Sequence, residues 1–341
     1  MKATACIDWL TFTVRSGREP REVVEKILQM DFELFQSKGY GLFGYRQAVE
    51  FGNILVMYDY AGNITSDMGV CVSMSGKGCR TFEQHTKRST GGGTPLVSLI
   101  CDLHADEFAN LSRVDLALDD TAGLLDLDKV VEKVDANEIN SFITCRNVVR
   151  GYNGKSRSGT TVYIGSPKSD FRIRFYDKAK EKYKKGQPEY EMHWVRCEIV
   201  MKHHNANGFA AALANTEDLG GMAAMILNDK IAFIEPGSDS NISRCVVCDW
   251  WQDFVDSVES VKLVVKEDAK HTVLDLMDWV QHQIAPTLSL INDAVGYEAI
   301  RKILKIGLEK RTPKQQALID DYRNCYKLNI VQTGTGAAIF V

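Results

Sequence analysis

The chain has 341 residues, a formal net charge of -4, 45% hydrophobic residues and 25% charged residues. This length and composition suffice for one large domain or two medium ones, and they exclude a mainly disordered chain. The longest apolar runs end well before the roughly 20 residues that a membrane span requires, and MKATACIDWLTF lacks a signal-peptide pattern, so we expect a cytoplasmic protein that uses no membrane.

The first part of the chain reads as mixed α and β structure. TACIDWLTFTV (4–14) is typical of a strand, and residues 18–39 have helical spacing of apolar residues and end in a glycine. Three short strand-like runs follow, at 41–49, 54–60 and 69–75. Two glycines in GKGCR (76–80) then predict a tight turn with close backbone approach.

The middle of the chain continues the alternation, and the end is helical. The expected helices there are 95–109 and 125–136, and the expected strands are 111–120, 141–148, 160–165, 171–178 and 193–202. From 206 onward the pattern is helical, at 207–230, 249–261, 272–284 and 297–311. We therefore expect an α+β fold with a largely antiparallel sheet in a domain 1–204, and a mostly helical domain 205–341.

Three of the expected strands show the same alternation of apolar and polar residues. Side chains alternate across a strand, so positions of one parity share a face. One face of each strand is mostly apolar. The other faces carry Arg113, Asp115, Ala117 and Asp119 in the first strand, Arg172, Arg174, Tyr176 and Lys178 in the second, and Trp194, Arg196, Glu198 and Val200 in the third.

If these strands belong to one sheet, their polar faces can lie together and bring acids, arginines and a tyrosine into one place. The alternative is that each face is the solvated side of an antiparallel sheet, with cross-strand ion pairs that contribute roughly 0.2–1 kcal/mol each. The local charge favours an anionic ligand, because residues 168–185 contain eight Lys or Arg and three Asp or Glu.

These residue types suit one chemistry. Carboxylates without histidine neighbours are oxygen ligands for a hard divalent ion, Mg²⁺ or Mn²⁺, which would polarise a phosphate. A tyrosine has an ordinary pKa near 10, but nearby cations or a metal favour its phenolate, and tyrosine serves as a covalent nucleophile. The set therefore fits transesterification of a phosphodiester by tyrosine.

The ordered motifs resemble the Rep_trans replication initiation factors, the rolling-circle initiators of certain plasmids, phages and integrative elements. The resemblance rests on IDWLTFT (7–13), SGKGCR (75–80), SRVDLALDD (112–120), TVYIGSPKSDFRIRFYDKAKE (161–181) and WVRCEIVMK (194–202). It implies a fold related to the HUH endonucleases, although the seven histidines contain no His-x-His pair. This departure leaves acidic residues as the expected metal ligands.

The resemblance also implies residue roles. Tyr176 matches the nucleophile, which would nick one strand at an origin, keep the 5′ phosphate and free a 3′ hydroxyl, then later rejoin the strand. Lys178 and Arg174 would hold the scissile phosphate or lower the phenol pKa. Expected metal ligands are Asp115, Glu198 and, third, Asp119. Expected DNA contacts are Arg113, Arg172, Arg196, Arg80 and Lys180.

The implied partners are origin DNA, single-stranded or in a hairpin, a host helicase and a host polymerase, with a homodimer as a further expectation. Two other functions fit the same residues. One is a non-catalytic origin-binding protein whose acids and arginines are structural. The other is a metal nuclease in which water replaces the tyrosine as the nucleophile.

Overall fold

The computed structural model describes most of the chain, in two compact units, Met1–Leu263 and Val264–Val341. The described residues are 3–15, 17–59, 68–88, 94–153, 156–183, 186–237, 241–260 and 280–311, with isolated positions 277, 315, 316, 319, 320 and 323. Among them no helix has the length and apolar character needed to cross a membrane.

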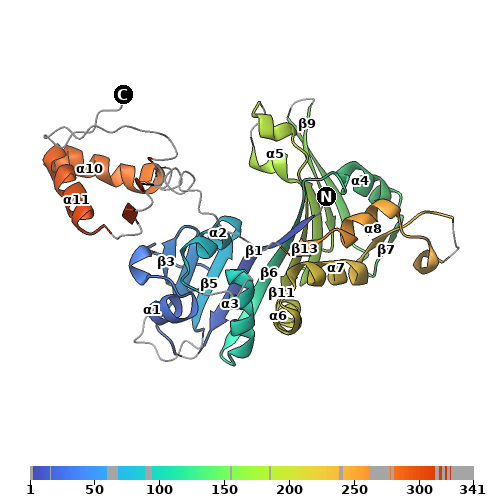
Figure 1. The fold of residues 1–341 in the computed structure, drawn as a ribbon, viewed down its shortest axis with the longest axis horizontal. Helices are drawn as coiled ribbons and strands as arrows, with labels where there is room; N and C mark the ends of the chain where they lie inside the picture. The colour runs from blue at the N-terminus through green and yellow to red at the C-terminus, as the bar shows by residue number, and fades with distance from the viewer. Residues whose placement is uncertain are drawn as a thin grey trace. The chain divides into compact units, whose positions relative to one another are not determined.

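An eleven-stranded sheet forms the first unit (Figure 1). Its order is β2-β3-β4-β5-β1-β6-β11-β10-β9-β8, and β13 pairs with β1. All of these pairings are antiparallel except the one between β1 and β13. The central strand β1 thus joins an N-terminal half of the sheet to the half that contains β6, β10 and β11.

The longer strands mostly overlap the positions that the apolar alternation predicts, but β8 begins at 146 rather than 141, and neither β2 nor β13 was expected. The strands of this sheet are β1 (Thr4–Val14), β2 (Gln36–Ser37), β3 (Gln47–Phe51), β4 (Ile54–Tyr58), β5 (Val70–Ser75), β6 (Ala109–Asp120), β8 (Arg146–Asn153), β9 (Ser156–Ile164), β10 (Phe171–Asp177), β11 (Val195–Lys202) and β13 (Glu259–Ser260). A separate pair is formed by β7 (Ile139–Asn140) and β12 (Ala232–Phe233).

Helices pack on the sheet and surround its edges. They are α1 (Pro20–Glu22), α2 (Gly76–His85), α3 (Pro95–Ala105), α4 (Leu127–Asp135), α5 (Lys178–Lys182), α6 (His204–Thr216), α7 (Leu219–Lys230) and α8 (Asp249–Asp256). Several begin with a polar side chain that accepts a hydrogen bond from a first-turn N–H, as Thr94 does for α3 and Asp126 does for α4. The expected α+β fold is confirmed.

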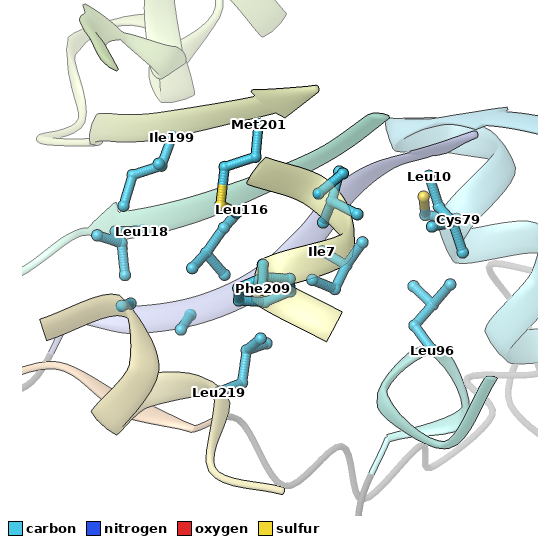
Figure 2. Close-up of a cluster of buried hydrophobic side chains, with 14 of the residues drawn as sticks. Ile7, Leu10, Cys79, Leu96, Leu116, Leu118, Ile199, Met201, Phe209 and Leu219 are labelled. Atoms are coloured by element: carbon cyan, nitrogen blue, oxygen red, sulfur yellow. The ribbon is translucent and has the colours of Figure 1, made fainter. Parts of the chain in front are cut away.

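The main apolar core lies between one face of the sheet and these helices. Figure 2 shows side chains from β1, β6 and β11 meeting those of α2, α3, α6 and α7. Leu116, Leu118, Ile199 and Met201 come from the apolar parity of β6 and β11, and Phe209 lies on α6. This core covers one face of the strands, so their polar parity is left for the opposite face.

Two local expectations differ from the structure. The helix expected at 18–39 is short, because after α1 and a π-helical turn (Val23–Ile27) the chain reverses at Gln29, whose φ is 53°. GKGCR is the first turn of α2 rather than a tight turn. Its Gly78 is nevertheless a point of close approach, since a Cβ there would lie 2.3 Å from the carbonyl oxygen of Asn53.

The first compact unit extends beyond the boundary expected at 204. That position falls between β11 and α6, and α6 packs on β6 and β11 while α7 packs on β1. The last strand, β13, pairs with β1. The helices that follow 204 therefore complete the core of the first unit.

The second unit contains the helices α10 (Ala285–Val295) and α11 (Tyr297–Glu309), which pack on each other. Gly296, with a φ of 91°, separates them. Most of the helix expected at 272–284 lies outside the described residues; its end, Val280–Ile284, is a π-helical turn.

Candidate active site

The sheet brings the three polar strand faces together. β10 pairs with β11 so that Arg174 lies opposite Glu198 and Tyr176 lies opposite Arg196. β11 pairs with β6 so that Arg196 lies opposite Asp119. The alternation of side chains therefore places the acids, arginines and tyrosine on the sheet face opposite the main core.

Tyr176 and Glu198 form the centre of this face. The Tyr176 hydroxyl donates a hydrogen bond to Glu198 Oε2 over 3.1 Å, and Arg174 donates one to the same oxygen over 2.6 Å. Both Tyr176 and Glu198 are buried, at 5% and 1% exposure. The phenol proton thus already points at a carboxylate that can accept it.

Asp115 lies beside Glu198 and completes a pair of buried carboxyl groups. Arg113 binds it through two hydrogen bonds, Nε to Oδ1 at 2.8 Å and a terminal nitrogen to Oδ2 at 2.6 Å. Burial raises the pKa of Asp115 to about 7, and the adjacent Glu198 charge and hydrogen bond add to this in spite of Arg113. Asp115 therefore resists ionisation unless a further cation reaches it.

The phenol of Tyr176 is not activated by this arrangement alone. Burial raises its pKa, and the Glu198 charge raises it further, while Arg196 and Arg174 act in the opposite direction. Of the two cations expected to lower the phenol pKa, Arg174 acts in that direction and Lys178 is not among the main influences, and burial outweighs both arginines. The hydroxyl proton of Tyr176 would therefore have to be removed as its oxygen attacks, and Glu198, which accepts a hydrogen bond from this hydroxyl, is placed to take it.

Asp119 belongs to a different set of contacts on the same face. It accepts two hydrogen bonds from Arg196 and one from the Trp194 indole, each at 2.7 Å. Arg196 also lies 2.9 Å from Asp8 Oδ2. Asp119 is four residues along β6 from Asp115, about 13 Å in a strand. The structure therefore does not bring Asp119 into the carboxyl pair.

Most of the expected DNA-contacting cations already have protein partners. Arg80 donates to the Ile7 carbonyl oxygen over 2.6 Å and lies 3.1 Å from Glu83, and Lys180 pairs with Asp177 at 2.8 Å. Arg113 and Arg196 hold the acids described above.

Arg172 and Lys178 complete the set of expected cations. Arg172 has no carboxylate partner within the described ranges, and its guanidinium lies 3.8 Å from the centre of the Tyr163 ring. Lys178 opens α5, where it pairs with Glu181 and lies 5.5 Å from the Tyr176 ring centre.

A pocket of about 330 Å³ opens beside Tyr176. Its lining includes Arg174 and Tyr176 from β10, Tyr163 from β9, Val149 from β8 and Lys180 from α5. The Nε atoms of Arg172 and Arg174 are buried and have no hydrogen-bond partner among the described residues. The lining also includes the carboxylates of Asp177 and Glu181, so an anion that entered here would meet Arg174 and Lys180 beside competing acceptors.

The residues best placed to hold a metal are Asp115 and Glu198. Among the described residues no group of three or more His, Cys, Asp or Glu side chains converges as a ligand set. Two carboxylates nevertheless fit Mg²⁺, which is usually bound through one or two carboxylates together with water and substrate phosphate oxygens. A divalent cation between them would also offset the repulsion that raises the pKa of Asp115.

Sequence reasoning missed Asp8 and Trp9. A bulge in β1 shifts its pairing with β6 between Ile7 and Trp9. Odd-numbered residues of β1 therefore face the core before the bulge, and even-numbered residues face it after the bulge. Asp8 consequently reaches Arg196, and the Trp9 ring lies 4.1 Å from the Arg113 guanidinium. Both residues are in IDWLTFT, but simple alternation cannot show which face they occupy.

Comparisons with known proteins identify the relatives of this chain. The model of the replication initiation factor family (Rep_trans) matches residues 109–306, and the N-terminal domain model of rolling circle replication initiation proteins matches residues 4–91. A protein of Bacillus subtilis (strain 168) named "Putative DNA relaxase NicK" is 28% identical over 303 residues, which cover 84% of this chain and 80% of that protein.

A solved structure extends the likeness to three dimensions. The rolling circle replication initiator protein from Geobacillus stearothermophilus superposes with a TM-score of 0.66 and 29% identity, over 74% of this chain and 96% of that one. The family model alone spans more than half of the sequence, and it includes β6, β10 and β11 with all their polar residues. The chain therefore belongs to the replication initiation factor family.

Proposed function

We propose that this protein nicks one strand of its origin DNA and thereby initiates rolling-circle replication, with Tyr176 as the nucleophile. The observation that carries the proposal is the hydrogen bond from the Tyr176 hydroxyl to Glu198 Oε2, in a buried site next to unpaired arginine donors. The initiator and relaxase names of the two relatives support the same activity.

The reaction exchanges one phosphate ester for another. The Tyr176 oxygen attacks the phosphorus of the scissile phosphodiester, its proton passes to Glu198, and the 3′ oxygen of the upstream nucleotide leaves and takes up a proton. The 5′ phosphate stays on the tyrosine. Because the number of phosphate ester bonds is unchanged, attack by a 3′ hydroxyl reverses the step and rejoins the strand.

The arginines stabilise the charge that develops on the phosphate. Arg174 is bound to Glu198 through one terminal nitrogen, and its buried Nε remains available to a phosphate oxygen. Arg172 offers a second such donor on the same strand face. Donors that are already oriented in a buried site stabilise a developing negative charge more than they would in water.

Asp115 and Glu198 would hold the divalent ion, Mg²⁺ or Mn²⁺. When bound, the ion would polarise the phosphate and neutralise part of its charge. Arg113 donates hydrogen bonds to both oxygens of Asp115, so an ion bound there would compete with Arg113 for this carboxylate. Asp119 is kept out of the proposed metal site by its three bonds to Arg196 and Trp194.

Replication needs further partners after the nick. The free 3′ hydroxyl suits extension by a host polymerase, and the displaced strand requires a host helicase. The second compact unit, whose α11 exposes Arg301, Lys302 and Lys305, is the part we propose for origin binding or docking. A homodimer, which would supply a second Tyr176, stays a prediction.

The test is to incubate the protein and Mn²⁺ with supercoiled DNA of its own genetic element and to analyse the products on a denaturing gel and by peptide mass spectrometry. We expect DNA attached to Tyr176, and no adduct with Tyr176→Phe. Tyr45→Phe is the matched control, since Tyr45 is a buried tyrosine whose hydroxyl donates to the Met68 carbonyl oxygen. Nicks without an adduct would indicate water as the nucleophile, and binding without nicks would leave a recognition function only.

A further inference from the structure

The loop that joins β2 to β3 exposes apolar side chains to solvent. It is a tight hairpin, because the Gly41 N–H donates to the Arg46 carbonyl oxygen over 3.2 Å and the Tyr45 N–H donates to the Leu42 carbonyl oxygen over 3.0 Å. Leu42 is 44% exposed, and Phe43, at the end of the hairpin, is 68% exposed. Large apolar side chains that gather at one exposed place indicate an interaction site.

The backbone at the end of the hairpin is strained by Phe43. Phe43 and Gly44 are the two central residues of the turn, and their φ values are 55° and 90°. Positive φ at both positions is the geometry of the turns that close two-residue hairpins, in which Asn or Asp usually precedes the glycine. An aromatic side chain is disfavoured at such a φ, so folding alone would favour asparagine at 43. A strained residue that is also exposed suggests a function for the side chain itself.

Tyr45 fixes this hairpin to the sheet face that carries Tyr176. Its ring is buried in an apolar cluster with Met57 and Cys71, and its hydroxyl donates to the Met68 carbonyl oxygen over 3.0 Å. Met57 and Cys71 have the opposite parity to the core residues of β4 and β5. The hairpin and the tyrosine site therefore lie on the same face of the sheet.

The ion pairs of the tyrosine site expose their cations rather than their acids. Asp115 and Glu198 are both buried, at 1% exposure. Their partners Arg113 and Arg174 each keep 32% of the side chain exposed. A polyanion that crossed this face would therefore meet guanidinium groups before it met a carboxylate.

The hairpin tip, residues 38–46, has the same bias. It contains two cations, Lys38 and Arg46, and no acid. Two acids contact it from outside this range: Glu50 pairs with Lys38, and Asp59 accepts a hydrogen bond from the backbone N–H of Arg46. Apolar side chains flanked by cations are the combination with which DNA-bending proteins insert a wedge between base pairs.

We propose that the hairpin tip is a wedge for DNA, in which Phe43 and Leu42 insert into a duplex at its junction with an unpaired strand and open the adjacent base pair. The assignment rests on the proposed nicking function and adds to it a surface that separates the strands. In a symmetric pairing of two hairpin tips, Lys38 and Arg46 would meet their own copies, which disfavours a second copy of the chain as the partner.

The experiment uses the full-length Tyr176→Phe protein, which lacks the nucleophilic hydroxyl. The probe is a forked DNA of arbitrary sequence, a duplex with one unpaired arm and a thymine in the first base pair of the fork. Low salt is used, because phosphate contacts then support binding of any sequence. We expect that binding makes this thymine reactive to permanganate, which oxidises unpaired thymines. A thymine that stays unreactive with saturating protein overturns the proposal.

Phe43→Asn in the same background is the decisive substitution, because asparagine suits the positive φ of this position. It should keep or raise the melting temperature, lower the affinity for the fork about tenfold, the order that one stacked base contributes, and leave the thymine unreactive. Phe142→Asn is the matched control, since Phe142 is 95% exposed and follows β7, outside the large sheet. The control should leave all three readings unchanged.

Each outcome decides the proposal. If Phe43→Asn folds and still opens the fork with unchanged affinity, the proposal is wrong. If Phe43→Asn lowers the melting temperature, the ring has a structural role, and Leu42→Ala, measured in the same way, decides instead. A change of oligomeric state in analytical ultracentrifugation, with fork opening intact, would identify the tip as a contact between copies and overturn the wedge. A missing adduct on the wild-type protein would refute the nicking function alone, because fork opening is measured in a protein that cannot form the adduct.

Discussion

The sheet face opposite the main core is apolar in one half of the sheet and charged in the other. In its N-terminal half, β3, β4 and β5 bury an apolar cluster of Tyr45, Ala48, Met57 and Cys71. Beyond β1, the same face of β6, β11 and β10 buries Asp115, Glu198, Arg196 and Tyr176 instead.

The change along this face is gradual. Cys71 lies opposite Thr13 of β1, and the Ser73 and Thr11 hydroxyls form a hydrogen bond over 3.0 Å. Thr11 then lies opposite Arg113 of β6. Apolar burial stabilises one end, whereas the charged end has a desolvation cost that its ion pairs only partly offset. The charged end is therefore explained by function better than by stability.

The largest effect that tests this difference should come from the apolar end. Met57→Ala removes a fully buried side chain from the second-face cluster and should lower the free energy of unfolding by about 2–5 kcal/mol. Urea denaturation measures this loss. Leu55→Ala on the same strand is the comparison, because Leu55 is only half-buried and should cost less. Adduct formation by folded Met57→Ala should match the wild type.

A substitution at the charged end should instead raise the free energy of unfolding and lower adduct formation. Asp115→Asn keeps the shape of the side chain but removes the charge, and it should reduce adduct formation by at least about 100-fold while it stabilises the fold. Burial raises the pKa of Asp115 from 3.8 to about 7, so the acid's contribution to stability is present below pH 3.8 and is lost as the pH rises through about 7. The advantage of Asn should therefore grow between about pH 4 and 7, then level off at no more than about 4 kcal/mol.

Glu83→Gln provides the control for this substitution. Burial also raises the pKa of Glu83 to about 7, but Glu83 lies on α2, which packs on β1, β4 and β5. Thermal unfolding at a series of pH values should show the same trend for both variants, and only Asp115→Asn should lose adduct formation. A stabilised Asp115→Asn protein that still nicks would remove Asp115 from the proposed metal site.

A smaller effect, on the affinity for DNA, should distinguish Arg172 from an arginine that is paired with carboxylates. Arg172→Gln should weaken binding of single-stranded DNA about threefold to tenfold and reduce the slope of log K against log salt by about 0.7, the value for one lost phosphate contact. Fluorescence anisotropy at several salt concentrations measures both. Arg21→Gln is the control, because Arg21 is exposed and pairs with Glu25 and Glu33. Equal slopes for the two variants would contradict a phosphate contact at Arg172.

The sequence predicted the strands of the site well, because alternation is a local property. Parity placed Arg174 and Tyr176 on the polar face of one strand and Glu198 on the polar face of another. That the two faces coincide depended on the condition that the strands belong to one sheet, and the pairing of β10 with β11 meets it. The partners of Asp119 could not be predicted from parity, since its bonds to Arg196 and Trp194 depend on the register between β6 and β11. Asp8 was missed because the bulge in β1 changes the parity within the strand.

Other differences have equally specific causes. The helix expected at 18–39 has the right apolar spacing, but the left-handed Gln29 ends it early. The glycines of GKGCR indicated a turn, whereas Gly78 serves close packing of α2 against the Asn53 carbonyl. The boundary expected at 204 followed a change from strand to helix, and such a change does not reveal that α6 and α7 pack back on the sheet.

The pairing of β13 with β1 has a consequence for how the protein is made. Thr4 of the central strand lies opposite Glu259, and the Ala3 N–H donates to the Ser257 hydroxyl over 3.3 Å. At a translation rate of roughly 5–20 residues per second, the first strand waits on the order of 10–50 s for this last neighbour. A nascent chain that ends at residue 204 would lack this neighbour together with α6 and α7, so the core of the first unit is completed only after the chain beyond residue 204 has left the ribosome.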